Sequence, residues 1–272
     1  MSRTRYDLIL GLGTACSCTE TIRKAGLQLL SFPFDWLTTT CVRPDETAHE
    51  LQGRVRELRD GFSTWFGRDD FRYVPPILDN GKDVYICDRL RLIFNHDFPK
   101  GLPFDQAFPI VRDRYRRRAD RLLEIIRGAG RVLLVRMDRP GQSAPTDVED
   151  CRAARVELSR AFAPTAFDFF LFNYDKGRGF RDRIEEEVEP GFTRLAFDYR
   201  NYEPGRPEHQ VDVRLTGSIL ARRFAVRDYR TPAERRRHLL STARKRWERW
   251  LRGIRRLINR IHPDNGHANE KN

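Results

Sequence analysis

The stretch YDLILGLGTACSC, Tyr6 to Cys18, decides the fold. Its apolar half is short and is followed at once by glycines, a pattern typical of a buried strand that ends at the edge of an α/β sheet. The next residues, Thr19 to Leu30, carry apolar side chains among polar ones at spacings that suit a helix. We therefore predict a strand, a glycine-rich turn and a helix start, with Cys16 where the turn meets the helix.

A cysteine at such a junction is a candidate nucleophile. The first turn of a helix has unpaired N–H groups and the positive end of the helix dipole, which lower a thiol pKa and stabilise a thiolate. Backbone N–H groups between Gly13 and Cys18, with those of Gly13 and Thr14 named first, can hold an oxyanion. The alternative is that Cys16 is an inert packing residue, as most intracellular cysteines are. Cys18 has no second pair at the spacing of a structural zinc site, so no metal site is predicted.

Helical and strand patterns alternate along the rest of the first 200 residues. Helices are predicted over residues 45–62, 104–127, 148–162 and 181–187, and strands over 83–98 (a hairpin or an edge strand), 131–136, 167–172 and 193–198. This alternation predicts an α/β fold with a mainly parallel central sheet and helices on both faces. Catalytic residues of such folds gather at the carboxyl ends of strands, where both Cys16 and Asp138 fall.

The excess positive charge lies in one C-terminal segment. The chain has a formal net charge of +12, and residues 222–260 alone carry fifteen Lys or Arg against three Asp or Glu. We predict an α/β domain over residues 1–220 that ends in a linker near 202–215. A basic amphipathic arm over 221–262 and a disordered, polar tail over 263–272 follow it.

The basic arm contains a predicted helix over residues 231–261. Thr231, Pro232 and Glu234 form a typical helix start. Apolar residues then recur at three- and four-residue steps, with Arg and Lys between them: Leu239, Leu240, Ala243, Trp247, Trp250, Leu251, Ile254, Leu257, Ile258 and Ile261. The apolar stripe fits the domain itself or a second subunit, an anionic membrane surface, or a polyanion. Nucleic acid ranks last among these partners.

The composition also limits the location of the chain. No stretch of eighteen apolar residues predicts a spanning helix, and Met1 to Asp7 leads into a strand without the apolar region of a signal peptide. Five cysteines without framework spacing fit free thiols in a reducing compartment. We expect a cytoplasmic protein, peripheral on the inner membrane if the basic helix binds lipid.

The glycine-rich turn partly matches a dinucleotide-binding fingerprint. Gly11 and Gly13 match its first two glycines, but Cys16 stands where the third belongs. Asp35, at the distance of the ribose-binding acid, lies in an aromatic turn and not at the end of a second strand. A nucleotide-binding enzyme therefore stays an alternative, and no cofactor is predicted.

Several blocks of the first half of the chain resemble a known family. They are Leu12-Gly13-Thr14-Ala15-Cys16, Arg23-Lys24-Ala25-Gly26-Leu27, Ser31-Phe32-Pro33-Phe34-Asp35-Trp36, His96-Asp97-Phe98 and Val135-Arg136. Over about residues 5–140 the chain resembles a bacterial family described as papain-like cysteine peptidases. The layout is also loosely similar to capsule-polysaccharide biosynthesis proteins linked to acyl transfer. The resemblance implies a cysteine hydrolase or acyltransferase whose substrate is an acyl compound or is related to peptides or polysaccharides.

The resulting site hypothesis is a Cys–His dyad. Cys16 attacks a carbonyl, and His96 removes the thiol proton and returns it to the leaving group. A third group usually fixes the tautomer of the base. Asp35 is the first candidate for this role and Asp138 the next. The alternative for His96 is a hydrogen bond to the backbone at a strand end.

Asp97 and Arg136 are weaker candidates for a role in the site. Asp97 adjoins His96, but neighbouring side chains of a strand point to opposite faces. Arg136 either binds an anionic group of the substrate or forms a structural ion pair. The rival to the enzyme hypothesis is a non-catalytic protein of envelope or capsule polysaccharide assembly, docked at the membrane by the basic helix.

Overall fold

The computed structural model describes residues 2–40, 44–76, 80–141, 145–200 and 210–261. It divides the chain into two compact units, Met1–Tyr229 and Arg230–Asn272. Residues 221–229, which the sequence analysis assigned to the basic arm, lie in the first unit. The tail over 263–272 and most of the linker near 202–215 lie outside the described residues.

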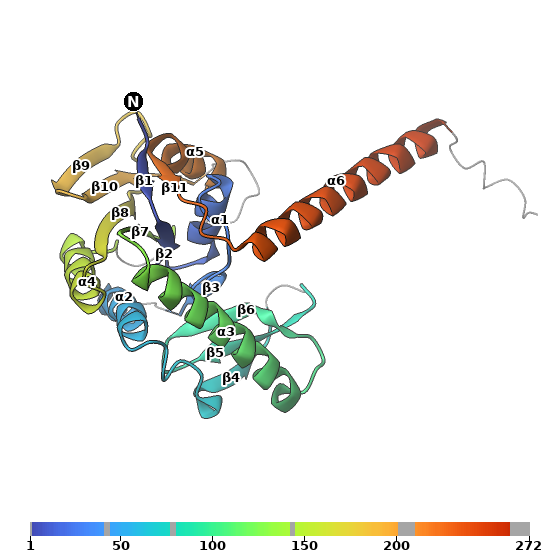
Figure 1. Ribbon diagram of the computed structural model, residues 1–272, viewed down its shortest axis with the longest axis horizontal. Coiled ribbons are helices and arrows are strands. Elements are labelled where there is room, and N and C mark those ends of the chain that lie inside the picture. Colours follow the sequence, from blue (N-terminus) through green and yellow to red (C-terminus); the bar gives the residue numbers. More distant parts are fainter. Residues whose placement is uncertain (1, 41–43, 77–79, 142–144, 201–209, 262–272) are drawn as a thin grey trace, which may run out of the picture. The chain divides into compact units, whose positions relative to one another are not determined.

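The first unit contains a five-stranded sheet with the strand order β2-β7-β8-β10-β9 (Figure 1). The strands are β2 (Leu8–Gly11), β7 (Arg131–Met137), β8 (Ala166–Tyr174), β9 (Ile184–Glu189) and β10 (Phe192–Phe197). The pairs β2–β7, β7–β8 and β8–β10 are parallel, and β9 is antiparallel to β10. The prediction of a mixed α/β fold is confirmed, and this sheet is mostly parallel.

The prediction of a helix over residues 181–187 is wrong. Most of this segment belongs to β9, the edge strand that pairs with β10 through a turn at Gly191, where φ is 78°. Glutamate favours helices in isolation, but the left-handed turn closes a hairpin instead. The run Glu185-Glu186-Glu187 suits an edge strand, since charged side chains prevent pairing with a further strand.

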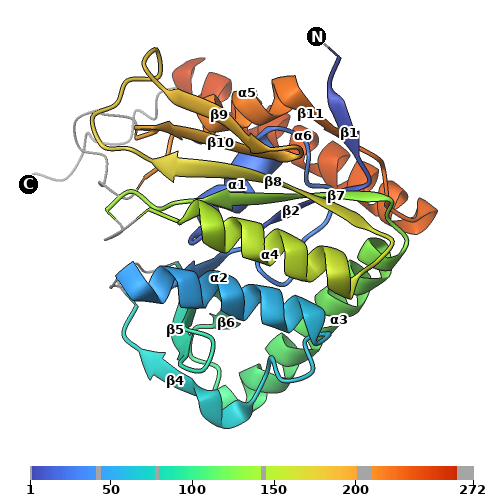
Figure 2. The same ribbon diagram turned by 90° about the vertical axis from the view of Figure 1, so that its left-hand side faces the viewer.

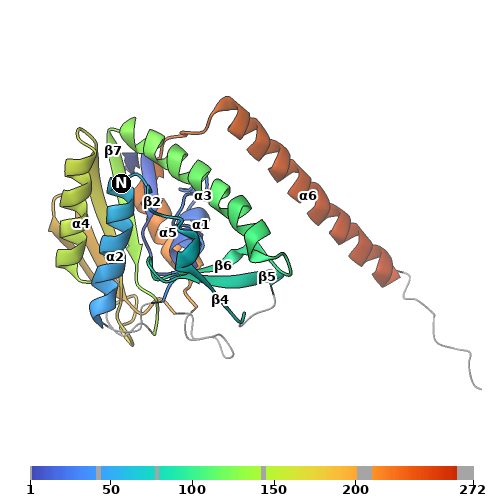
Figure 3. The ribbon, with the colours of Figure 1, turned by 90° about the horizontal axis from the view of Figure 1, so that it is seen from below.

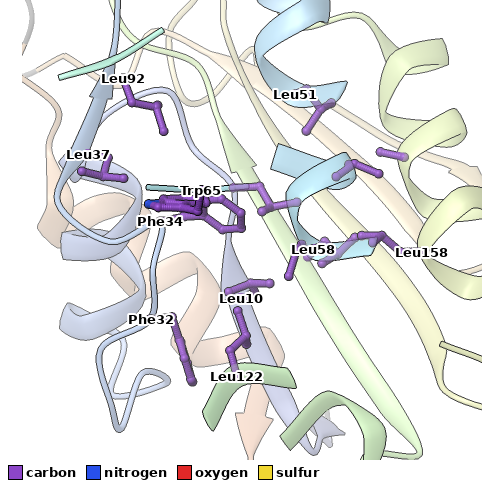
Figure 4. Close-up of a cluster of buried hydrophobic side chains, with 14 of the residues drawn as sticks. Leu10, Phe32, Phe34, Leu37, Leu51, Leu58, Trp65, Leu92, Leu122 and Leu158 are labelled. Carbon is purple, nitrogen blue, oxygen red and sulfur yellow. The ribbon is translucent and has the colours of Figure 1, made fainter. Parts of the chain in front are cut away.

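Successive residues of a strand point to opposite faces of the sheet, so they contribute to two different apolar clusters. Helices pack against both clusters. Val132 and Leu134 belong to one cluster, with side chains of α2, α3 and α4; Leu133 and Val135 belong to the other, with side chains of α1 and α5. The helices are α1 (Cys16–Lys24), α2 (Pro44–Arg59), α3 (Phe104–Arg127), α4 (Val148–Ala161) and α5 (Val213–Arg223). Figures 2 and 3 show α2 and α4 side by side, and Figure 4 shows part of the first cluster around Phe34 and Trp65.

A second, antiparallel sheet has the order β3-β6-β5-β4. Its elements are β3 (Leu37–Thr39), a short 3-10 helix (Arg68–Asp70), β4 (Phe71–Val74), β5 (Lys82–Cys87) and β6 (Leu92–Pro99). The hairpin predicted over residues 83–98 is confirmed as β5–β6. The Thr39 N–H donates to the carbonyl of Thr14 at 2.9 Å, so this sheet is joined directly to the turn between β2 and α1.

Two further parts complete the described chain. Strands β1 (Thr4–Tyr6) and β11 (Phe224–Val226) form a small parallel pair in the first unit. The second unit contains α6 (Pro232–Ile261), which begins with a capping box. There Glu234 N–H donates to Thr231 Oγ1 at 3.2 Å, and Thr231 N–H donates to Glu234 Oε2 at 2.9 Å. The predicted basic helix is confirmed.

Candidate active site

The turn between β2 and α1 continues along the carboxyl end of β7. Leu12 N–H donates to the carbonyl of Val135 at 2.8 Å, and Thr14 N–H donates to that of Met137 at 3.3 Å. Gly13 allows the helix to pack onto this turn, because a Cβ at residue 13 would lie 2.2 Å from the Cβ of Cys18. The glycine is therefore required for packing, and it places Cys16 at the first position of α1.

Cys16 is the accessible thiol among the described cysteines. It is partly exposed, whereas Cys18, Cys87 and Cys151 are buried, and all four are free. The helix cap, Ala15, has no side-chain hydrogen bond, and the first turn has no acidic residue. Cys16 thus lies beside helix N–H groups that no capping side chain occupies.

The environment of Cys16 raises its thiol pKa. Burial is the largest cause and the negative charge of Glu20 is the second; the N–H groups of Cys16 and Ser17 and the charge of Arg139 act in the opposite direction. We predicted a lowered pKa from the helix dipole, and the net direction is the reverse. The thiol is therefore protonated near neutral pH, and a base must remove its proton before it can attack.

The amide groups predicted to hold an oxyanion have other acceptors. Thr14 N–H donates to Met137, and the Gly13 amide lies within hydrogen-bonding reach of the Cys18 sulfur. The amides that face the Cys16 sulfur are those of Cys16 and Ser17. The N–H groups closest to the Cys16 sulfur therefore belong to the first residues of α1 and not to the glycine turn.

Cys18 is a packing residue. Its side chain is 1% exposed and its Sγ donates to the carbonyl of Val135 at 3.4 Å. Burial raises its pKa to about 12. This thiol supports the turn from below and has no role as a nucleophile near neutral pH.

His96 lies on β6 with an exposed side chain. Its ring meets the ring of Trp36 edge-on, with 6.2 Å between centroids, and the Arg23 guanidinium lies 4.8 Å from the Trp36 centroid. Cys16, Glu20 and Arg23 share one face of α1, since they are four and seven residues apart. His96 is therefore linked through Trp36 to the face that carries Cys16, about 10 Å along the helix. Within the described part of the chain, no hydrogen bond joins Cys16 to His96.

Asp35 is buried, and its hydrogen bonds join it to residues other than His96. Its carboxylate accepts hydrogen bonds from the Phe32 N–H at 2.7 Å, the Thr19 hydroxyl at 3.1 Å and the Gln28 amide. Burial raises its pKa in spite of these donors. The neighbouring Trp36 has φ 66°, a region that bulky residues rarely adopt. Asp35 thus ties the aromatic turn to α1.

Asp97 and Asp138 are also occupied by structural partners. Asp97 faces α3 and accepts from the Tyr115 hydroxyl at 2.8 Å and from Arg114 at 3.3 Å. Asp138 follows β7, as predicted, and its two carboxylate oxygens accept from the backbone and hydroxyl of Thr146, from the Asn173 amide and from the Tyr174 N–H. These bonds leave neither acid directed at His96.

Arg136 is a buried structural residue and does not face solvent. Its side chain is fully buried, and its Nη1 donates to Glu50 at 2.5 Å and to the carbonyl of Leu12 at 2.7 Å. Arg54 pairs with the same carboxylate. Burial disfavours the charged form of Glu50, but the charges of Arg136 and Arg54 outweigh it and lower the Glu50 pKa. Arg136 therefore anchors the glycine turn to α2.

Sequence reasoning did not single out Glu20, Arg139 or the contact between Trp36 and His96. Glu20 carries a readable signal, because it lies four residues after Cys16 on a predicted helix. Arg139 follows directly after Asp138, so it also lies just beyond the carboxyl end of a predicted strand, where catalytic groups gather. The contact of Trp36 with His96 depends on the pairing of β3 with β6, which no local pattern specifies.

The geometry bears on the metal and nucleotide alternatives as well. Among the described residues, no group of three or more His, Cys, Asp or Glu side chains is placed to hold a metal ion. The acid that a dinucleotide ribose would need, Asp35, is enclosed by its own hydrogen bonds. Comparison of the chain with family models, with curated proteins and with solved structures found no match.

Proposed function

We propose that this chain is a cysteine-dependent hydrolase or acyltransferase with Cys16 as its nucleophile. One observation carries the proposal. Cys16 is the partly exposed thiol at the start of α1, beside the carboxyl end of β7, while the other described cysteines are buried. The proposal takes the five-stranded sheet as the central element of the fold, with the site at the edge where parallel α/β sheets place their catalytic groups.

The reaction begins with the transfer of the Cys16 proton to His96. The sulfur then forms a bond to the carbonyl carbon of the substrate, and the carbonyl electrons move onto oxygen, where the Cys16 and Ser17 amides stabilise the charge. The carbonyl re-forms and the leaving group departs with the proton from His96, which leaves a thioester on Cys16. Water or an acceptor hydroxyl or amine then takes the acyl group, and the thiol is restored.

We assign the role of base to His96 because its exposed ring contacts Trp36, which in turn lies against Arg23 of α1. Its exposed ring rests against Trp36, so it reaches Cys16 only if substrate binding draws the two together. Catalytic hydrogen bonds are often long before substrate binds. The resemblance to papain-like cysteine peptidases supports the same pair of residues.

The proposal places the enzyme in the cytoplasm. Cys16, Cys18, Cys87 and Cys151 are all free thiols, which is typical of a reducing compartment. The resemblance favours a substrate with an ester, thioester or amide carbonyl, and it leaves open whether water or another acceptor receives the acyl group.

Acylation by p-nitrophenyl acetate tests the nucleophile. We expect release of nitrophenol together with an acetyl group on the Cys16 peptide, detected by mass spectrometry, and loss of both in Cys16→Ala. The matched control is Cys41→Ser, which removes a different thiol of the chain and should keep both signals. Acetylation that is absent from Cys16, or equal at Cys18, would overturn the proposal.

A histidine scan tests the base separately. His96→Ala should slow acetylation of Cys16 by about 10²-fold or more near neutral pH, with recovery at higher pH where the thiol ionises unaided. His238→Ala, on α6, serves as the control, and His49→Ala and His209→Ala complete the comparison. If one of these last two variants shows the loss instead, the nucleophile stands and the base must be reassigned.

A further inference from the structure

Helix α6 carries a stripe of exposed apolar side chains in the second unit. Leu239 and Leu240 are 68% and 64% exposed, and Trp247 and Trp250 are 59% and 55% exposed. The two indole rings stack on each other, with 4.8 Å between centroids. Large apolar side chains gathered in this way mark a surface that binds something.

The sequence pattern of α6 places its apolar positions on one side. With 3.6 residues per turn, the ten apolar positions between Leu239 and Ile261 fall within an arc of about 120°. The helix is 30 residues long, which corresponds to about 45 Å. It also carries eleven Lys or Arg against two Glu, a net charge of +9. The apolar arc is therefore flanked by arginine over most of its length.

Charge decides between the partners that would cover this stripe. A second α6 would fit the apolar pattern, since Leu240, Ala243, Trp247, Trp250 and Ile254 follow a heptad spacing. Two such helices would, however, bring two charges of +9 together. A polyanion such as nucleic acid would satisfy the arginines and leave the tryptophans and leucines in water. An anionic lipid surface satisfies both faces of the helix at once.

We propose that α6 binds an anionic lipid surface and lies along it, with Trp247 and Trp250 in the interface. Tryptophan is favoured there because its ring is apolar and its N–H remains near water. Among the described residues, no helix has a stretch long and apolar enough to cross a membrane, which agrees with a helix that lies on the surface. The binding stands independently of the chemistry at Cys16, and its test requires no activity.

Co-sedimentation of the full chain with vesicles tests this binding. We expect binding to vesicles of equal parts phosphatidylglycerol and phosphatidylcholine, and little binding to phosphatidylcholine alone. Binding should weaken strongly at high salt, since the Debye length falls from about 30 Å at 0.01 M to about 3 Å at 1 M. Tryptophan emission should shift to shorter wavelength on binding to the anionic vesicles.

Two pairs of variants separate the apolar and cationic contributions. Trp247→Gln with Trp250→Gln keeps the charge and should weaken binding about tenfold or more; the control is Tyr73→Gln with Ile110→Gln, two exposed apolar residues of the first unit. Arg237→Gln with Arg252→Gln should weaken binding on the order of tenfold at low salt. Its control, Arg116→Gln with Arg117→Gln on α3, makes the same charge change and should have no effect.

Three outcomes would overturn the proposal. Equal binding to both kinds of vesicle would remove the role of charge. Binding that survives the tryptophan variants would indicate a polyanion-type interaction of the arginines alone. No vesicle binding, with a dimer in sedimentation that the tryptophan variants dissociate, would show that the stripe joins two copies; a monomer without vesicle binding would show that it packs on its own first unit.

Discussion

The two sides of the turn between β2 and α1 differ in almost every physical respect. On one side, Arg136 and Glu50 form a fully buried ion pair, and Arg136 also donates a hydrogen bond to the Leu12 carbonyl. Cys18 packs against Gly13 on the same side. On the other side, Cys16 is partly exposed between the charges of Glu20 and Arg139. The closed side fixes the position of the turn, and the open side is free to react.

This difference shows how one short segment combines rigidity with chemistry. The closed side depends on close packing and on a buried ion pair, so a change of volume or charge there lowers the stability of the fold. The open side depends on electrostatics that a single surface residue can alter. Substitutions on the two sides should therefore have different consequences, the first for stability and the second for reactivity.

The largest expected effect is the difference in thiol reactivity across the turn. In a Cys41→Ser background, iodoacetamide should label Cys16 at least on the order of a hundred times faster than Cys18, because Cys18 is buried with a pKa of about 12. Peptide mass spectrometry of the folded protein gives both rates. Equal rates would erase the distinction between the two sides, and labelling in denaturant, where the two thiols should react alike, is the control.

Removal of the buried arginine should produce the next largest effect. Arg136→Met leaves the Leu12 carbonyl without its donor and Glu50 with one cation fewer, and should cost about 3 kcal/mol of unfolding free energy. Denaturant titration followed by circular dichroism measures the loss. Arg59→Met, which breaks an exposed ion pair with Glu157, should leave the transition where it is. Similar losses in the two variants would mean that the buried pair does not anchor the turn.

The next effect in size is that of a methyl group added to a glycine. It should lower the stability of the fold in the turn and raise it in α2. Gly13→Ala places a Cβ against Cys18 and should cost about 1–3 kcal/mol. Gly53→Ala, in α2, meets no atom within 4 Å and should stabilise the chain by up to about 1 kcal/mol. Thermal unfolding of both variants compares them directly, and a tolerated Gly13→Ala would show that the closed side can yield.

The smallest expected effect is a shift in the pH profile of Cys16 alkylation, on the open side of the turn. Glu20 raises the Cys16 pKa, so Glu20→Gln should move the pH profile of Cys16 alkylation toward lower pH without a change in stability. Because burial is the larger cause of the raised pKa, the profile should still lie above that of an ordinary thiol. Glu124→Gln on α3 serves as the control. A shift toward higher pH would contradict the assigned sign of the Glu20 interaction.

Local patterns were sufficient for most elements of the first unit. The helix from Phe104 to Arg127 has the bounds that its amphipathic spacing predicts, and the glycine turn does lead from a strand into a helix at Cys16. The patterns failed where pairing between distant segments decides the structure. β9 is a strand because β10 lies beside it. Neither α5 nor β3 was predicted; β3 has three residues and is a strand through its pairing with β6.

The sequence indicates candidate residues for the site, but not the contacts that their side chains make. Sequence position indicated Cys16, His96, Asp35 and Asp138. Cys16 begins α1 and Asp138 follows β7, whereas Asp35 lies in the turn before β3 and His96 lies within β6. Which hydrogen bonds these side chains make depends on groups such as Thr19 and Asn173, which no motif marks. Asp35 and Asp138, the carboxylates predicted to orient His96, instead accept hydrogen bonds that hold turns in place.

The connection between β2 and β7 has a consequence for the order of folding. These strands are neighbours in the sheet, yet residues 12–130 separate them, including the whole of the second sheet. The pairings of β7 with β8 and of β8 with β10 span far shorter segments, and closing short loops is faster. We therefore expect β2 to dock late, after synthesis has passed β7. Cys16 would then reach its helix start only as the last strand is added to the sheet, which delays any thiol chemistry until the rest of the fold is complete.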